Sequence, residues 1–510
     1  MTPADLTNST MLIHLGLARC SLTRLEILNL PNLHSLDLSD NDIVSIREEH
    51  LSFLPNLYQL SLAGNHLTSS LFTEHVSQRA FQSMRILDMS RVYILKLNTS
   101  IFTAFNTLKI LNLSGNGIQA ITDDGLNSLA DLRLLDLRGS PVTEFPPNIF
   151  HDLSELQTVF ADNYKLCCPV NLPTHFNPAH CHAPVDEISS CDNLLRSNVY
   201  RAFLAVFAVL ALLGNLGSFF FRVIPAKRRA VQAFGVFVTH LCVADFLMGV
   251  YLAVIGVADR LYQGTYVWED KAWRTSAFCR LVGFLSLLSS EVSAFIICLI
   301  TLDRFLVLRF PFSQFRFRKA SAHGACLAVW ALGILVAAVP LLPHTSHWEF
   351  YSQTGICIPL PITRKVFPGQ SYSFAVMILL NFVLFLFIAL GQVFIYWSIR
   401  SNAMTNADAG KRSRDLTIAS RLLTVAMSDF LCWFPIGVLG LAASAGHHIP
   451  GEVNVAMAIF VLPFNSALNP FLYTLNMVLE RRARAREERL TAILVSRLKS
   501  AESCSTSRGQ

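Results

Sequence analysis

Seven apolar stretches in the second part of the chain constrain its fold more than any other feature. They lie near residues 200–222, 232–257, 277–308, 322–342, 371–398, 416–444 and 453–475. Each exceeds the roughly 18 residues that mark a transmembrane helix. Because lipid offers no hydrogen-bond partners to backbone groups, these stretches must be helices. With 52% hydrophobic and only 15% charged residues, the chain is too apolar for a soluble globular protein.

Basic residues in the connecting loops are distributed unequally between the two sides of the membrane. The first, third and fifth loops are flanked by Arg222, Lys227, Arg228, Arg229, Arg309, Arg316, Arg318, Lys319, Arg400, Lys411, Arg412 and Arg414. The alternate loops hold Arg260, Lys271, Arg274, Arg364 and Lys365. The positive-inside rule then predicts an extracellular N-terminus and a cytoplasmic C-terminus. The net charge of +6 therefore reflects topology and does not indicate nucleic-acid binding.

The first part of the chain repeats a leucine pattern. Frames of the form L-x-x-L-x-L begin at Leu12, Leu33, Leu57, Met84, Leu108, Leu132 and Leu156, 21 to 27 residues apart. This spacing is typical of leucine-rich repeats, in which each leucine set forms a strand that needs neighbours to bury it. We therefore predict an extracellular α/β solenoid over residues 1–166. Asn41, Asn65, Asn116 and Cys20 stand where a side chain can bond buried turn backbone.

Strand alternation leaves the residues between the leucines on the concave face. One column there consists of Gly16, Asp37, Ser61, Asp88, Asn112, Asp136 and Phe160. The carboxylates of Asp37, Asp88 and Asp136 could receive a basic ligand. The alternative is that aspartate is simply common at this repeat position.

Three N-x-Ser/Thr sequons, at Asn8, Asn98 and Asn112, suit a glycosylated, exported domain. A glycan at Asn112 would mask part of the concave face, unless that sequon is unused. No signal peptide or cysteine cap precedes the first frame. We therefore expect either a longer natural N-terminus or a first span that acts as a reverse signal anchor.

Four cysteines follow the repeats within 25 residues: Cys167, Cys168, Cys181 and Cys191. On the extracellular side they predict two disulfides in a hinge over residues 167–196, and the pairing stays open. A zinc site is the competing interpretation. Cys279, at the outer start of the third span, and Cys357, in the loop before the fifth, could form a further bridge.

Polar residues inside the spans are costly and indicate function. Asp245 lies within the second span and Asn215 within the first, while Ser293, Asn465, Ser466 and Asn469 are available in the third and seventh. Such a set could hold a cation with water.

Asn215, Asp245 and Asn469 belong to a series of motifs in the right order for one family. The motifs are Gly214-Asn215, Leu241 to Asp245, Asp303-Arg304-Phe305, Trp330, Cys432-Trp433-Phe434-Pro435 and Asn469-Pro470-Phe471-Leu472-Tyr473. Residues 197–475 thus resemble a rhodopsin-type G-protein-coupled receptor, an all-α bundle of seven transmembrane helices.

The resemblance implies roles for individual residues. Asn215, Asp245, Ser293 and Asn469 match the family's allosteric sodium pocket, and no other cofactor is expected. The activation switch matches Asp303, Arg304, Asp415, Trp433, Pro435, Asn469, Pro470 and Tyr473. Arg304 is the arginine that holds the inactive state and then meets the G protein, and Asp415 is its expected partner. A solvated loop charge is the alternative for Asp415.

Repeats, hinge and bundle together are similar to the leucine-rich-repeat G-protein-coupled receptors. Asp303-Arg304 and the intact Cys432-Trp433 favour the relaxin-receptor branch over the glycoprotein-hormone branch. Two departures put coupling efficiency in doubt: Phe305 follows Arg304, and Gly391 stands about where a tyrosine is expected.

Residues 476–510 carry a basic stretch followed by serines. Arg481, Arg482, Arg484, Arg486 and Arg489 predict an interfacial helix on anionic lipid. The serines offer phosphate acceptors for arrestin, with a plain disordered tail as the alternative.

The sequence therefore predicts a plasma-membrane receptor that binds a peptide or protein hormone outside and a heterotrimeric G protein inside. A leucine-rich adhesion or decoy protein, in which the bundle is only an anchor, is the second hypothesis. No hydrolase, phosphate-loop or metal-ligand motif indicates an enzyme.

Overall fold

The computed structural model describes residues 9–46, 48–67, 81–98, 102, 105–186, 188–226, 233–310, 316–358, 368–405, 428, 434–447 and 449–475. The chain divides into two compact units, residues 1–186 and 187–510. The boundary between them lies inside the predicted hinge, residues 167–196.

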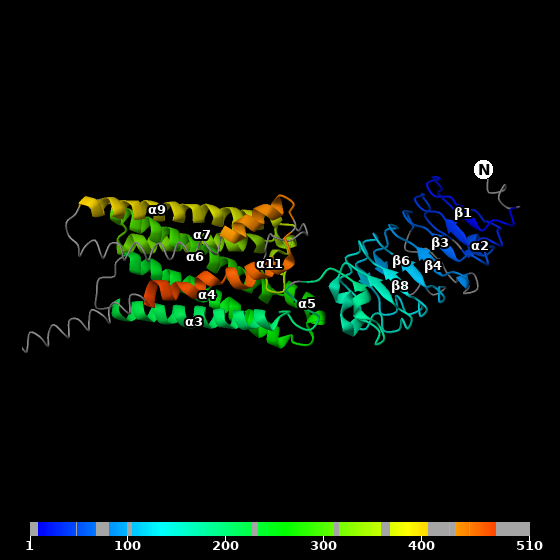
Figure 1. The fold of residues 1–510 in the computed structure, drawn as a ribbon, viewed down its shortest axis with the longest axis horizontal. Helices are drawn as coiled ribbons and strands as arrows, with labels where there is room; N and C mark the ends of the chain where they lie inside the picture. The colour runs from blue at the N-terminus through cyan, green and yellow to red at the C-terminus, as the bar shows by residue number, and fades with distance from the viewer. Residues whose placement is uncertain are drawn as a thin grey trace, which may run out of the picture. The chain divides into compact units, whose positions relative to one another are not determined.

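The first unit is a stack of short parallel strands (Figure 1). Its main sheet contains, in order, β1 (His14–Gly16), β2 (Ser35–Asp37), β3 (Gln59–Ser61), β4 (Ile86–Asp88), β6 (Ile110–Asn112), β8 (Leu134–Asp136), β9 (Thr158–Phe160) and β10 (Cys181–His182). Each of the seven predicted frames contains one of these strands, and β10 adds an eighth. The predicted fold class, a repeat solenoid followed by a helical bundle, is confirmed.

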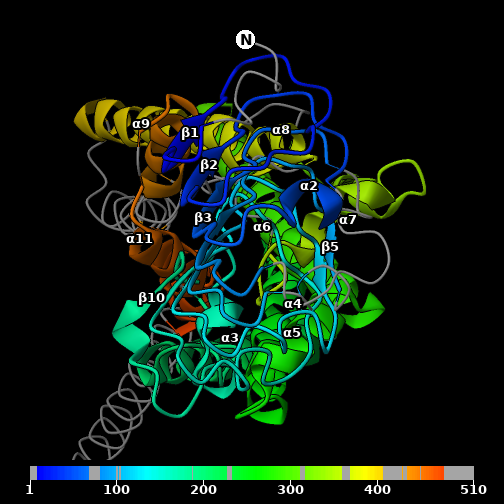
Figure 2. The same cartoon turned by 90° about the vertical axis from the view of Figure 1, so that its right-hand side faces the viewer.

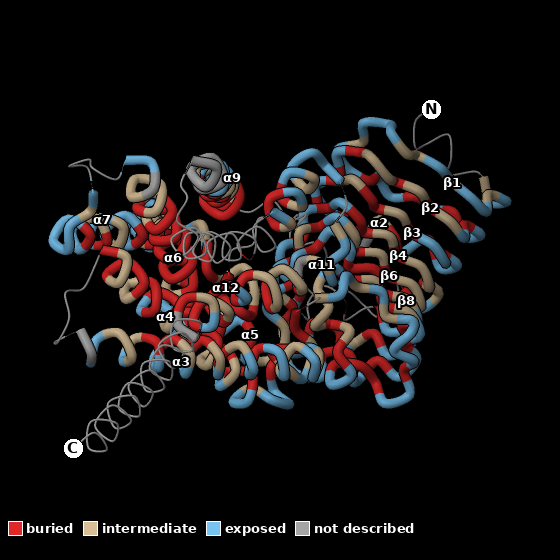
Figure 3. The backbone as a smooth tube through the Cα atoms, turned by 60° about the vertical axis from the view of Figure 1, so that its left-hand side comes forward, coloured by how far each residue is buried: buried red, intermediate tan, exposed pale blue. Residues whose placement is uncertain are grey.

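The register of the sheet aligns the repeats residue for residue. Leu36 pairs with Leu60, Leu60 with Leu87, and Leu111 with Leu135. These leucines are fully buried, and Figure 3 shows buried residues running along the strands. Successive strands lie side by side, as β1, β2 and β3 do in Figure 2. Burial in one repeat therefore depends on the next repeat.

The side of the stack away from the main sheet is built mostly of turns. In the described part of the repeats it includes a short helix, α2 (Glu48–Leu51), and a second, two-stranded sheet of β5 (Lys96–Leu97) and β7 (Ala120–Ile121). Buried asparagines bond the turns that follow the strands. Asn65 Nδ2 donates to Leu38 O and Leu62 O, each at 2.9 Å, and its Oδ1 accepts from Ile43 N at 3.0 Å.

Asn41 and Asn116 make equivalent bonds in their own turns, as the sequence predicted for these positions. The Cys20 thiol also bonds turn backbone, at 3.4 Å to Ala18 O, but this side chain is exposed, and the Cys20 backbone N–H donates to Asn41.

The end of the first unit is closed by three single-turn 3₁₀ helices, Tyr164–Cys167, Pro169–Asn171 and Pro178–His180. A disulfide joins Cys167 to Cys181, the first residue of β10. Cys168 and Cys191 are disulfide-bonded as well. The cysteine segment therefore supplies the last strand of the solenoid.

The second unit is a bundle of long helices (Figure 1). Its main members are α3 (Asn198–Ala226), α4 (Ala233–Leu261), α6 (Ala277–Arg309), α7 (Lys319–Ala338) and α9 (Asn381–Thr405). A short outer helix, α5 (Tyr266–Thr275), precedes α6. Helix α9 continues α8 (Gln370–Ser373) through a π-helical segment, η9 (Phe374–Leu380).

Five helical segments of the described residues are long and apolar enough to cross a membrane: Asn198–Ile224, Ala233–Leu261, Ala277–Val307, Lys319–Leu341 and Gln370–Ser398. They correspond to the first five predicted spans. Shorter apolar helices, Phe434–Ser444 and Met457–Tyr473, lie in the other two. The latter runs through η10 (Met457–Val461), α12 (Phe464–Pro470) and η11 (Phe471–Leu475), after α11 (Gly451–Ala456).

We predict that Asn65→Ala lowers the local stability of the repeats by about 3 kcal/mol, because buried backbone groups lose their partners. Hydrogen–deuterium exchange of the amides between Leu38 and Asn65 measures this change. Asn127→Ala, which truncates an exposed asparagine, should change stability by less than about 0.5 kcal/mol. Equal exchange in the two variants would contradict the role of Asn65.

Candidate functional site

Asp245 is the centre of a buried polar cluster in the bundle. It lies on α4 and is fully buried. Its Oδ1 accepts hydrogen bonds from Ser293 Oγ of α6 at 2.9 Å and from Ser466 Oγ of α12 at 3.0 Å. Its Oδ2 accepts from Asn469 Nδ2, also of α12, at 2.8 Å. Side chains of two other helices therefore converge on one carboxyl group.

Asn215 joins this cluster from α3 through the backbone. Its Nδ2 donates to Ala211 O at 2.8 Å and to Ser466 O at 2.9 Å. The Oδ1 atoms of Asn215 and Asn469 are buried and have no hydrogen-bond partner among the described residues. The structure thus brings together all four residues predicted for the sodium pocket, and Ser466 is a further member.

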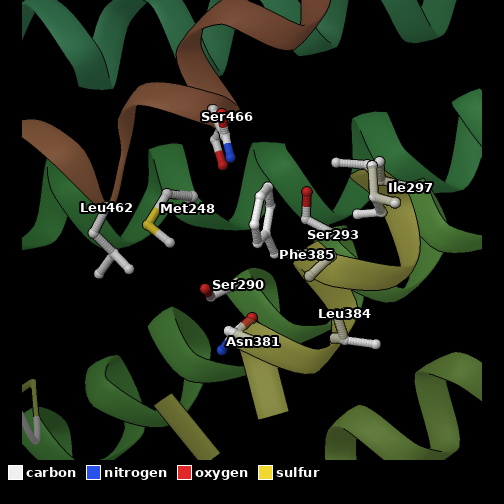
Figure 4. Close-up of a pocket in the computed structure, with 12 residues that line it drawn as sticks. Met248, Ser290, Ser293, Ile297, Asn381, Leu384, Phe385, Leu462 and Ser466 are labelled. Carbon is white, nitrogen blue, oxygen red and sulfur yellow. The ribbon is translucent and has the colours of Figure 1, made fainter. Parts of the chain in front are cut away.

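A cavity of about 20 Å³ lies beside the cluster, large enough for one water-sized species. Ser293 and Ser466, which both bond Asp245, line it, as do Ser290 and Asn381 (Figure 4). Asn465 is a further polar residue of the lining. Carboxylate, hydroxyl and amide oxygens are the ligands that hard cations prefer. The residues present therefore fit a small hard cation.

Arg304 lies near the end of α6 that precedes the third loop. Its guanidinium group stacks on the ring of Phe234 of α4, 4.2 Å from the ring centroid. Its Nη2 is 3.3 Å from Asp303 Oδ2. Arg222 of α3 donates from Nη2 to Tyr473 O at 2.9 Å. Arg304 is therefore held within the bundle by the ring of Phe234 and the carboxylate of Asp303.

Two residues of the predicted switch, Asp415 and Trp433, lie outside the described residues. The Arg304–Asp415 latch and the role of Trp433 therefore stay predictions. Pro435 lies in the apolar helix Phe434–Ser444, and Pro470 is the last residue of α12.

The end of the bundle that carries α5 is closed by loops that are tied to it. A disulfide joins Cys279 of α6 to Cys357 in the loop before α8. In the same loop the Tyr351 hydroxyl donates to Ala337 O at 2.7 Å, and burial raises the pKa of this phenol. Trp273 Nε1 of α5 donates to Gly355 O at 2.7 Å. The loop is thus fixed against three helices.

The segment that leads into α3 also packs on the bundle. Leu194 and Leu195 are fully buried in the bundle core. Asp259, near the C-terminal end of α4, accepts hydrogen bonds from Leu195 N at 2.8 Å through Oδ1 and from Arg201 Nε at 2.8 Å through Oδ2. Arg201 Nη2 in turn donates to Leu195 O at 2.9 Å. One buried carboxylate therefore pins this segment.

The predicted acidic column of the concave face has a structural role in each turn. The Oδ1 atoms of Asp37, Asp88 and Asp136 each accept the backbone N–H two residues later, at 2.9 to 3.0 Å. Asn112 makes the same bond to Ser114 N. This turn geometry accounts for aspartate at the position.

Asp136 differs from Asp37 and Asp88, because the Arg138 side chain is already paired with its carboxylate. Arg138 donates from Nε to Asp136 Oδ1 at 3.0 Å, and this hydrogen bond raises the pKa of the arginine. The Arg138 guanidinium also lies 4.7 Å from the ring centroid of Phe160. A basic ligand would have to displace Arg138, whereas Asp37 and Asp88 are half-buried and open to it.

The three predicted glycosylation sites differ in their surroundings. Asn98 is exposed, Asn112 lies within β6, and Asn8 lies outside the described residues. Their modification stays a prediction.

Sequence reasoning missed two buried carboxyl groups of the long helices α4 and α6, Asp259 and Glu291. Glu291 lies inside a predicted span, where an acidic residue is costly, whereas Asp259 lies just beyond the predicted span 232–257. No motif spacing pointed to a partner, because the partners Arg201 and Asn381 lie on other helices.

Comparison with known proteins matches both parts of the chain. The model of the 7 transmembrane receptor (rhodopsin family) matches residues 221–473, and the leucine rich repeat model matches residues 82–142 and 106–163.

Several receptors are similar to this chain over part of their length. G-protein coupled receptor GRL101 from Lymnaea stagnalis is 36% identical, over 64% of this chain and 29% of that protein. Relaxin receptor 2 from Homo sapiens is 34% identical, over 58% of this chain and 39% of its own length. Lutropin-choriogonadotropic hormone receptor from Sus scrofa is 26% identical, over 61% and 42%. The chain spans less than half the length of these relatives.

We predict that Asp259→Ala destabilises the end of the bundle that carries α5 by about 3 kcal/mol, because Arg201 loses its buried partner. Exchange of the Leu195 amide with deuterium should accelerate accordingly. Asp192→Ala, a change at an exposed position of the same segment, serves as the control and should leave that amide protected. An unchanged Leu195 amide in Asp259→Ala would contradict the pinning role.

Proposed function

We propose that this chain, in which residues 221–473 match the rhodopsin family of seven-transmembrane receptors and leucine-rich repeats precede the bundle, is a receptor for an extracellular peptide hormone of the relaxin/insulin-like or a similar type. Hormone binding on the repeats is coupled to activation of a heterotrimeric G protein by the bundle. The proposal involves binding and conformational change, with no covalent chemistry.

The buried cluster around Asp245 is the observation that carries the signalling part of the proposal. A membrane anchor has no need of a carboxyl group that side chains of α6 and α12 reach at 2.8 to 3.0 Å. Such a cluster makes helix positions interdependent, as a two-state bundle requires. A leucine-rich adhesion or decoy protein would need only apolar surface there.

On the hormone side, Asp37 and Asp88 are the acidic groups of the concave face that remain open to a basic ligand. The relatives favour a relaxin-type hormone, since relaxin receptor 2 is 34% identical and the lutropin-choriogonadotropic hormone receptor 26%. A glycoprotein hormone is the second candidate.

The pinned segment before α3 and the loop held by Cys279–Cys357 are the elements that relay binding to the helices. The segment is bonded to Asp259 of α4, and the loop is bridged to Cys279 of α6. These two helices also carry Asp245 and Arg304. A ligand that stabilises one arrangement of these elements shifts the population of bundle states. Arg304 then becomes available to the G protein.

The chain is a multi-pass membrane protein, and we place its N-terminus outside the cell and its C-terminus in the cytosol. The disulfides Cys167–Cys181 and Cys279–Cys357 support this orientation, because disulfides persist in oxidising compartments. The plasma membrane is the location that a hormone receptor requires.

We predict that sodium stabilises the ligand-free receptor through the Asp245 cluster by about 1 kcal/mol at a concentration several-fold above its dissociation constant. The thermal unfolding of the purified receptor in sodium chloride, compared with choline chloride, measures this effect. Asp245→Asn should abolish it, while Asp123→Asn, at an exposed position of the repeats, should preserve it. A sodium effect that survives Asp245→Asn would place the ion elsewhere.

The receptor hypothesis is tested by expressing the chain with an added signal peptide and measuring cellular cAMP and calcium. We expect Asp415→Ala to raise basal output several-fold, because the latch on Arg304 is lost, and Arg304→Ala to abolish output. Surface expression of each variant is the control. Silence of all versions at equal surface expression would favour the adhesion or decoy protein.

A further inference from the structure

Two histidines meet on the surface of the bundle where α4 and α7 pack against each other. His240 of α4 is half-buried and His323 of α7 is exposed, although both lie inside segments that are long and apolar enough to cross a membrane. Their rings stand edge to face, with centroids 5.5 Å apart, and His240 Nε2 lies 3.3 Å from His323 Nδ1. Polar side chains in a membrane span are costly, so this pair indicates a function.

Trp330 of α7 fixes the direction of the hydrogen bonds in this arrangement. Its Nε1 donates to His240 Nδ1 at 3.3 Å. An indole N–H can only donate, so His240 Nδ1 is an acceptor and the proton of this neutral ring is on Nε2. His240 Nε2 therefore donates to His323 Nδ1, and the proton of His323 is on its own Nε2. A second proton on either ring would set two donors against each other.

The chain of donors ends at His323 Nε2, which has no hydrogen-bond acceptor in the described part of the chain. A Cβ added to Gly324, the next residue, would lie in open space. The terminal N–H therefore lies at an open surface. Hydrogen bonds in a chain polarise one another, so this N–H is a stronger donor than that of an isolated imidazole.

The depth of the pair in the membrane decides which acceptors are within reach. The apolar segment Lys319–Leu341 is about 34 Å long at 1.5 Å per residue, against a hydrocarbon core of about 30 Å. His323 lies about 6 Å along the axis from the first residue of α7. It is therefore close to the edge of the hydrocarbon core, next to the region of the lipid headgroups.

The surface around the pair is basic toward the end of α7 and apolar toward the middle of the membrane. Lys319, four residues before His323 and on the same face of α7, is exposed. Leu327, four residues after His323, is exposed as well, and so is Val243, three residues after His240 on α4. A phospholipid has the same order of groups, with a charged head followed by apolar chains.

We propose that this surface binds an anionic phospholipid. His323 Nε2 donates to a phosphate oxygen, the Lys319 ammonium group pairs with the negative charge of the headgroup, and an acyl chain lies over Leu327 and Val243. In the proposed orientation this end of α7 faces the cytosol, and the cytoplasmic leaflet carries the anionic lipids. The charge of Lys319 favours this occupant over a sterol, whose hydroxyl group is neutral.

Native mass spectrometry of the detergent-purified receptor, with phosphatidylserine, phosphatidylcholine or cholesterol added in turn, tests the proposal. His323→Leu should reduce the population of the one-phosphatidylserine adduct several-fold, because the terminal N–H is lost. His323→Gln should retain most of the adduct, since glutamine can accept from His240 and donate to phosphate. His347→Leu, which changes an exposed histidine of the loop after α7, should leave the adduct unchanged.

The preference for anionic lipid tests the part of Lys319. The wild type should bind phosphatidylserine several-fold better than phosphatidylcholine, and Lys319→Gln should bind the two about equally. Lys271→Gln, at an exposed position of α5, should keep the preference of the wild type.

Equal phosphatidylserine binding by the wild type and His323→Leu would overturn the proposal. So would a cholesterol adduct that His323→Leu removes while phosphatidylserine binding is unchanged, because the occupant would then be a sterol. The unfolding temperature of each variant in detergent, together with the His323→Gln variant, separates loss of lipid from loss of folding. The measurement uses neither hormone nor G protein, so its failure would leave the proposed receptor function untouched.

Discussion

Polar groups inside the bundle must find partners on neighbouring helices, and this requirement determines which helices stay together. Asp245 illustrates it most clearly, since its two oxygens accept three hydrogen bonds from α6 and α12. Asn215 adds α3 through the backbone of Ser466. Lipid chains are as apolar as leucine, so leucine contacts alone cannot specify helix neighbours in a membrane. The few polar contacts supply that specificity.

The solenoid solves a different problem, because water surrounds it. Its strands are only two or three residues long, and no strand could bury its leucines alone. Stacking buries them, and the buried asparagines then satisfy the turn backbone that stacking removes from water. Each repeat therefore depends on the next one along the chain, whereas each helix of the bundle depends on residues far away in sequence.

This difference explains what could be predicted from the sequence. The L-x-x-L-x-L frames located seven strands, because repeat contacts are local and periodic. The eighth strand was missed, since Cys181-His182 carries no leucine. Asn215, Asp245 and Asn469 were found through their motifs and Ser293 as a polar residue inside a span, and the structure brings the four together. Glu291 and Asn381 belong to no spacing pattern. Their contact depends on a π-helical segment that no sequence pattern indicates.

The aspartates of the concave face show that one sequence pattern can indicate either turn stabilisation or ligand binding. Their positions were predicted, but Asp37, Asp88 and Asp136 each serve their own turn, and Asp136 also pairs with Arg138. An aspartate at this repeat position thus stabilises the local turn before it can contact any ligand. Contact with a basic ligand would depend on which oxygens remain open, and only coordinates resolve that question.

The place of Asn112 in β6 has a consequence for biosynthesis. Its neighbours in the sheet are β4 and β8, and its side chain already caps the turn at Ser114. If the solenoid is exported as proposed, sugar transfer to this asparagine would compete with strand pairing while the chain is being translocated. A fast-folding solenoid would then leave the concave face bare, and a slow one would receive a glycan there. The timing of synthesis, and not only the sequon, would decide which surface the proposed hormone meets.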